Sequence, residues 1–89
     1  MDKKVISIEF FFAGGCEKCA AARDALRDAV QATRVARWTE IDIGREPNRA
    51  VDVGVLSTPA VAIDGELLFK SMPSRAQLKK AIAARAAKS

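Results

Sequence analysis

The sequence predicts an α/β domain with the element order β-α-β-α-β-β-α, in which a mixed sheet of four strands is flanked by three helices. Three observations support this fold class. A run of β-branched and aromatic residues covers Val5 to Ala13, apolar residues then recur at helical spacing, and two short apolar runs within 59–69 are joined by a turn sequence. Because 89 residues provide enough material for one core, we expect residues 1–89 to form a single domain.

The first predicted strand is central and the second is an edge strand. The near-continuous apolar character of Val5 to Ala13 indicates burial on both faces of a sheet. From about Cys16 to about Ala36, apolar residues recur at steps of three and four, which is typical of a helix packed on one side. Residues 38–44 alternate between polar and apolar, as a half-buried edge strand does. We expect these two strands to be parallel and joined by a right-handed crossover.

A short helix and a hairpin are predicted next. Pro47 suits the first turn of a helix, and Gly54 can end that helix in a left-handed conformation. Asp64 and Gly65 tolerate the positive φ angles of a two-residue type I′ turn. Residues 59–69 are therefore predicted to form a β-hairpin.

The last helix is predicted over about 74–87. Ser74 and Gln77 have the spacing of a capping box, in which each side chain accepts a hydrogen bond from the backbone of the other residue. Two further residues are interpreted as packing residues and not as parts of a site: Trp38 on the edge strand and Met72 after the hairpin.

Charge and hydropathy bear on the partners of the protein. The net charge is +4, but no aromatic residues interleave with the basic residues near the carboxyl terminus, so we expect a solvated helix face and no nucleic-acid surface. No apolar run approaches the roughly 20 residues that span a bilayer, so no membrane association is expected. The amino-terminal segment lacks the long apolar stretch of a signal peptide, which favours a cytoplasmic location.

The motif Cys16-Glu17-Lys18-Cys19 falls where the first strand leads into the first helix. The unpaired N–H groups and the dipole of a helix amino terminus stabilise a thiolate, so we expect a depressed pKa for Cys16. Lys18 would lower this pKa further and Glu17 would oppose the effect. Gly15 is interpreted as a turn residue that leaves Cys16 accessible. Cys19, one helical turn further on, is close enough for a disulfide with Cys16 after modest adjustment.

These two thiols can carry out thiol–disulfide exchange. The Cys16 thiolate would attack a substrate disulfide, and Cys19 would then attack Cys16 to release the reduced substrate. The redox-active Cys16–Cys19 disulfide takes the place of a cofactor, and none is expected. Two cysteines are too few for a disulfide-stapled secreted scaffold.

The Cys-x-x-Cys after the first strand, the Thr58-Pro59 pair before the third strand and the element order resemble a small thioredoxin/glutaredoxin-like domain over essentially the whole chain. The resemblance implies a thioredoxin-like fold and a thiol–disulfide oxidoreductase. It implies that Pro59 is cis and lies beside the cysteine pair, and that Thr58 and Pro59 position an extended substrate segment. It also implies a disulfide-containing protein substrate, a reductase or small thiol as electron donor, and a monomeric protein.

The chain departs from the family pattern at several positions. Gly15 replaces the usual tryptophan before the nucleophile, and Glu-Lys replaces Gly-Pro between the cysteines. Phe10 stands where thioredoxins carry a buried aspartate, which leaves the deprotonation of Cys19 without that carboxylate. Residues 69–74 lack the Gly-Gly and acidic residue of glutathione-binding members, so strong glutathione binding is not implied.

Two other functions use the same cysteines. A copper or zinc module could bind its ion through the Cys-x-x-Cys, but the chain has no His and no third Cys to close a tetrahedral site, so no metal site is predicted. A thioredoxin-fold interaction module with inactive cysteines is the third hypothesis. Replacing Cys16 by Ser separates the interaction module from the oxidoreductase, because partner binding would survive in the first and disulfide reduction would be lost in the second.

A Cys-x5-Arg phosphatase is excluded, because Ala22 stands where the arginine is required.

Overall fold

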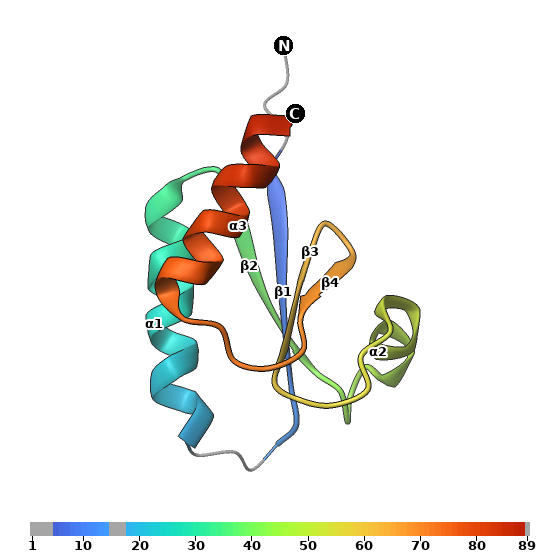
Figure 1. Ribbon diagram of the computed structural model, residues 1–89. Helices are drawn as coiled ribbons and strands as arrows, with labels where there is room; N and C mark the ends of the chain where they lie inside the picture. Colours follow the sequence, from blue (N-terminus) through green and yellow to red (C-terminus); the bar gives the residue numbers. More distant parts are fainter. Residues whose placement is uncertain (1–4, 15–17, 89) are drawn as a thin grey trace.

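The chain alternates strands and helices in the order predicted from the sequence. The computed structural model describes residues 5–14 and 18–88, with side chains described for residues 5–14 and 20–87. In chain order the elements are β1 (Ile6–Phe12), α1 (Lys18–Thr33), β2 (Ala36–Asp42), α2 (Pro47–Val53), β3 (Ala60–Ile63), β4 (Glu66–Phe69) and α3 (Arg75–Lys88) (Figure 1). The predicted four-stranded mixed sheet with three helices is confirmed.

The strands form one sheet in the order β2-β1-β3-β4. β1 runs parallel to β2, with Ile6 opposite Ala36, and antiparallel to β3, with Phe11 opposite Ala60. β4 is antiparallel to β3 and forms the second edge of the sheet. The predictions of a central first strand and an edge second strand are both confirmed, because β1 is hydrogen-bonded on both sides and β2 on one.

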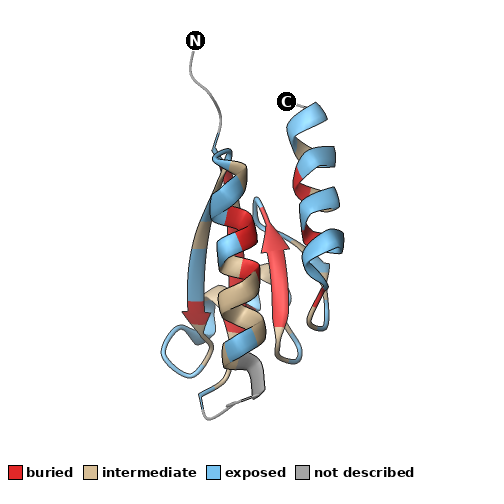
Figure 2. Ribbon diagram, turned by 90° about the vertical axis from the view of Figure 1, so that its left-hand side faces the viewer, coloured by how far each residue is buried: buried red, intermediate tan, exposed pale blue. Residues whose placement is uncertain are grey.

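The two faces of the sheet carry separate apolar clusters, because successive β1 side chains point to opposite faces. Ile8 and Phe10 pack with residues of α1 and α3, whereas Phe11 packs with Ala50 of α2. α1 and α3 lie together on one side of the sheet and α2 lies on the other (Figure 1). The buried residues gather on the inner strands β1 and β3 and on the inner sides of α1 and α3, while the outer side of α3 is exposed (Figure 2). Burial of these two clusters holds the layers together.

Both residues predicted to be packing residues contact the first of these clusters. The Trp38 ring stacks on Phe10, with ring centroids 5.4 Å apart. Met72 is partly buried against the same cluster. Both predictions are confirmed.

The junction between α1 and β2 differs from its prediction. α1 ends at Thr33, not at about Ala36, and Ala36 is already the first residue of β2. Arg34 adopts a left-handed conformation with φ of 60°, which stops the helix. The Thr33 hydroxyl donates a hydrogen bond of 2.7 Å to the Val30 carbonyl oxygen within the last turn. Pairing of Ala36 with Ile6 of β1 then starts the strand at once.

Local turn and cap signals were predicted correctly. Asp64 and Gly65 both have positive φ, 52° and 83°, as a type I′ turn requires. The backbone N–H of Ser74 donates to Gln77 Oε1 at 2.9 Å, and the N–H of Gln77 donates to Ser74 Oγ at 3.0 Å, which completes the capping box. Gly54, with φ of 89°, ends α2. In the described part of the chain, no helix combines the length and apolar character needed to cross a bilayer.

Candidate active site

The carboxyl-terminal half of the predicted cysteine motif, Lys18 and Cys19, opens α1. Cys19 is the second residue of α1, directly after Lys18, so its backbone is helical. Gly15, Cys16 and Glu17 lie outside the described residues, and the side chains of Lys18 and Cys19 are also not described. The described part of the motif therefore lies at the start of the helix that follows the buried central strand.

Thr58 and Pro59 lie at the end of the sheet from which the chain leads to the cysteine motif. The Thr58–Pro59 peptide bond is cis, as the resemblance predicted. Ala60, the next residue, is opposite Phe11 near the carboxyl end of β1. Because β1 and β3 are antiparallel, the start of β3 lies beside the end of β1 that continues toward Cys16. Both Thr58 and Pro59 are half-buried.

The loop between α2 and β3 presents a side chain that the sequence reasoning missed. Leu56 is 97% exposed, although it is large and apolar. A small hollow adjoins it, lined by Gly54, Leu56, Ser57, Ala60, Leu67 and Lys70. The signal in the sequence was a leucine two residues before Thr58, in a segment with neither helical nor strand periodicity. An exposed apolar side chain next to a hollow is a surface that an apolar group of a partner can cover.

Glu9 was missed as well. It lies in the middle of β1, only 7% exposed, and accepts two hydrogen bonds from Arg49 of α2. Arg49 Nε lies 2.7 Å from Oε2 and Nη2 lies 2.6 Å from Oε1 of Glu9. The hydrogen bond to Glu9 is the main cause that raises the pKa of Arg49 above its ordinary value. The signal in the sequence was a carboxylate inside an aromatic strand.

The position of Glu9 bears on the family's missing aspartate. Phe10, which occupies that position, is fully buried in the cluster beneath α1 and α3. The Glu9 side chain points to the other face of the sheet, where it pairs with Arg49 of α2. Cys19 belongs to α1, which covers the face of Phe10. Glu9 therefore does not substitute for the aspartate as a base next to Cys19.

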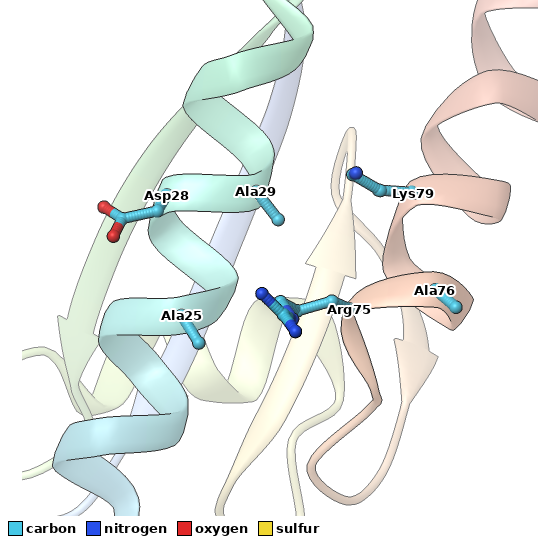
Figure 3. Close-up of a pocket in the computed structure, with 6 residues that line it drawn as sticks. All are labelled: Ala25, Asp28, Ala29, Arg75, Ala76 and Lys79. Carbon is cyan, nitrogen blue, oxygen red and sulfur yellow. The ribbon is translucent and has the colours of Figure 1, made fainter.

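A wider groove lies between α1 and α3, away from the residues predicted to form the site. It is lined by Ala25, Asp28, Ala29, Arg75, Ala76 and Lys79 (Figure 3). Arg75 and Lys79 extend from α3 toward α1, and the Asp28 side chain of α1 points away from α3 (Figure 3). The groove exceeds the hollow beside Leu56 in volume, about 670 Å³ against about 80 Å³, but no predicted site residue lines it. The size of a groove therefore does not locate the chemistry here.

Comparison with known proteins assigns the chain to a family. Residues 4–83 match the thioredoxin domain family. The chain belongs to the thioredoxin family. A probable thioredoxin of Methanothermobacter thermautotrophicus is 33% identical to this family member over 79 residues, which are 88% of this chain and 93% of the relative. The thioredoxin of Methanocaldococcus jannaschii is 27% identical over 78 residues, or 86% and 92% of the two chains.

Solved structures agree on the fold of this thioredoxin-family protein. The oxidised form of mitochondrial thioredoxin 3 from Saccharomyces cerevisiae superimposes with a TM-score of 0.71 at 22% identity, covering 92% of this chain and 81% of that one. The predicted thioredoxin-like fold is confirmed. The protein is a thiol–disulfide oxidoreductase, with the disulfide-containing substrates and reductase partners that family membership implies. The metal-binding alternative is not favoured by these relatives.

Proposed function

We propose that this thioredoxin-family protein reduces protein disulfides through Cys16 and Cys19. The observation that carries the proposal is the position of Thr58 and Pro59 directly before β3, beside the end of β1 that leads to the cysteine motif. A cysteine pair and an extended backbone segment at one end of a sheet provide the two parts that the reaction needs. One part exchanges electrons and the other holds an extended substrate.

Cys16 is the nucleophile in this mechanism and Cys19 is the resolving thiol. The Cys16 thiolate attacks one sulfur of the substrate disulfide, forms a mixed disulfide, and expels the other sulfur as a thiolate that takes a proton from water. Cys19, once deprotonated, attacks the Cys16 sulfur and expels the second substrate thiolate. Two electrons pass to the substrate, and the Cys16–Cys19 disulfide remains. Lys18 favours the Cys16 thiolate, Glu17 opposes it, and Gly15 leaves the sulfur accessible.

The substrate is held by strand addition at Thr58. An extended segment of the substrate pairs with the Thr58 backbone, and main-chain hydrogen bonds supply affinity without requiring a particular sequence. Pro59 ends this edge, because a proline has no N–H to donate. Leu56 covers an apolar side chain of the same segment.

The oxidised pair must be reduced again before the next cycle. A reductase or a small thiol supplies the two electrons, and no metal or organic cofactor is needed. We expect the protein to do this as a monomer, without nucleic acid or a membrane.

Replacing each cysteine by serine tests this function. Cys16→Ser is expected to lower insulin reduction by dithiothreitol to the rate without protein, because no thiolate remains to attack. Cys19→Ser is expected to accumulate a mixed disulfide with insulin, detected as a mass increase that dithiothreitol reverses. Substantial turnover by Cys16→Ser would contradict the assignment of the nucleophile, and a trapped adduct on Cys19 in place of Cys16 would reverse the two roles.

A further inference from the structure

The buried ion pair between Glu9 and Arg49 links β1 to α2. Among the residues whose burial is described, Glu9 is the only buried charged one. Arg49 donates from both Nε and Nη2, so the pair has the bidentate geometry of a guanidinium on a carboxylate. The Arg49 side chain is 40% exposed and reaches Glu9 from the surface of the molecule.

Stability alone is a weak reason for this pair. Removing a carboxylate from water is costly, and replacing a buried ion pair by apolar side chains often leaves stability unchanged or raises it. What the pair has and an apolar contact lacks is direction, because two parallel hydrogen bonds fix the angle between the partners. The pair therefore sets the orientation of α2 on the sheet.

The orientation of α2 determines the course of the loop that follows it. α2 has seven residues, and its buried residue is Ala50, the neighbour of Arg49. The carbonyl oxygen of Ala50 accepts hydrogen bonds from the N–H groups of Gly54, at 3.0 Å, and Val55, at 2.8 Å. A change in the angle of α2 would therefore move the start of the loop that ends at Thr58.

Arg49 also approaches the β3–β4 hairpin. A β-carbon added to Gly65 would lie 3.9 Å from Arg49 Nη2. The guanidinium thus lies between the central strand and the hairpin turn, so the carboxyl-terminal half of β3 and the turn after it lie next to the ion pair: Ala62 is opposite Glu9, and Gly65 lies next to Arg49.

We propose that Glu9 and Arg49 are positioning residues that orient the Thr58 backbone for the substrate strand. This inference rests on the proposed function. Since Glu9 is on the face of the sheet opposite α1, the pair acts on substrate binding and not on the reactivity of the sulfurs. Loss of the pair should raise KM for a protein substrate and leave attack on a small disulfide unchanged.

Arg49→Lys is the first test, because lysine keeps the charge but cannot form the two parallel hydrogen bonds. We expect KM for insulin to rise about fivefold or more, since a misplaced positioning group can cost up to about a hundredfold. The kcat for insulin and the rate with 2-hydroxyethyl disulfide should stay within about twofold of wild type. Arg45→Lys is the matched control, because Arg45 precedes α2, is exposed, and makes no side-chain hydrogen bond or ion pair with a described residue. Equal KM values in all three proteins would overturn the inference.

A double variant separates positioning from stability. Glu9→Gln alone leaves Arg49 without its carboxylate and can destabilise the fold. Glu9→Leu with Arg49→Leu removes both charges, and we expect it to be folded by circular dichroism and at least as stable as Glu9→Gln in urea. Its KM for insulin should nevertheless stay raised. A folded double variant with the wild-type KM, or one that loses activity toward the small disulfide as well, would show that the pair does not position the substrate strand.

Amide spectra distinguish failure of this inference from failure of the proposed function. If wild type reduces neither insulin nor 2-hydroxyethyl disulfide, the proposed function is wrong. Positioning is then decided by the ¹H–¹⁵N shifts of residues 55–58. Shifts that move in Arg49→Lys and not in Arg45→Lys support the inference, and shifts unchanged in both overturn it.

Discussion

Leu56 and Thr58 lie two residues apart on one loop, and in the proposed mechanism they contribute differently to substrate binding. Thr58 offers its backbone, which any extended segment can use, whereas Leu56 offers an exposed side chain that favours apolar neighbours. The preference of the protein for one substrate over another is therefore expected to depend on Leu56 more than on Thr58. The side chain has few contacts to lose in the free protein, so its effect on binding can be measured separately from its effect on folding.

Leu56→Ser tests this division. KM for insulin should rise about fivefold, because losing roughly 1 kcal/mol of apolar contact weakens binding by that factor. The free energy of unfolding should change by less than about 0.5 kcal/mol, as for other exposed positions. Val51→Ser is the control, since Val51 is also exposed and apolar, at 77%, but lies on α2 before the loop. Insulin kinetics and urea unfolding of both variants would test the prediction, and an equal effect of the two substitutions would argue against a specific role for Leu56.

Elements with local signals were predictable, and those set by distant contacts were not. The capping box of α3 and the Asp64-Gly65 turn depend on neighbouring residues, and both were correctly predicted. The end of α1 depends on where β2 must begin pairing with β1, and the periodicity of the helix does not report that. Arg34 consequently takes a left-handed conformation that its own residue type does not favour.

Arg34→Gly should therefore stabilise the protein. Glycine adopts positive φ without the strain of a β-carbon, and this gain exceeds the entropy that glycine adds to the unfolded chain. We expect the free energy of unfolding to rise by roughly 0.5 kcal/mol. Ala32→Gly should lower the free energy of unfolding by about 1 kcal/mol, because Ala32 lies inside α1 and has a helical backbone, whereas Arg34 follows the helix. Urea unfolding of both variants measures this, and a loss of stability in Arg34→Gly would mean that its side chain matters more than its backbone.

At the scale of the whole molecule, the sheet topology assembles the candidate site. The antiparallel pairing of β1 with β3 places Thr58 and Pro59 at the end of β1 that leads to the cysteine motif, although about 40 residues separate them in the sequence. The resemblance to a known family predicted this arrangement from two short motifs. It did not predict the contact of Glu9 with Arg49, because a pairing across 40 residues depends on where α2 lies on the sheet.

The same topology places the proposed redox chemistry and the proposed substrate positioning on opposite faces of the sheet. The helix with Cys19 lies on one face of the sheet, and Glu9, Arg49 and α2 lie on the other. The buried side chain of Phe10 occupies the β1 position beneath α1 where the family resemblance implies an aspartate. The reduction potential of the protein depends on the cysteine pair and the start of α1.

A redox titration tests the central claim most directly. The protein would be equilibrated in graded thiol/disulfide buffers, its free thiols trapped by alkylation, and the reduced fraction read by mass. We predict a single two-electron transition between the dithiol and a Cys16–Cys19 disulfide near about −270 mV, the value typical of thioredoxins. Absence of an intramolecular disulfide in every buffer would contradict the account, and a potential above roughly −200 mV would contradict its direction of electron flow.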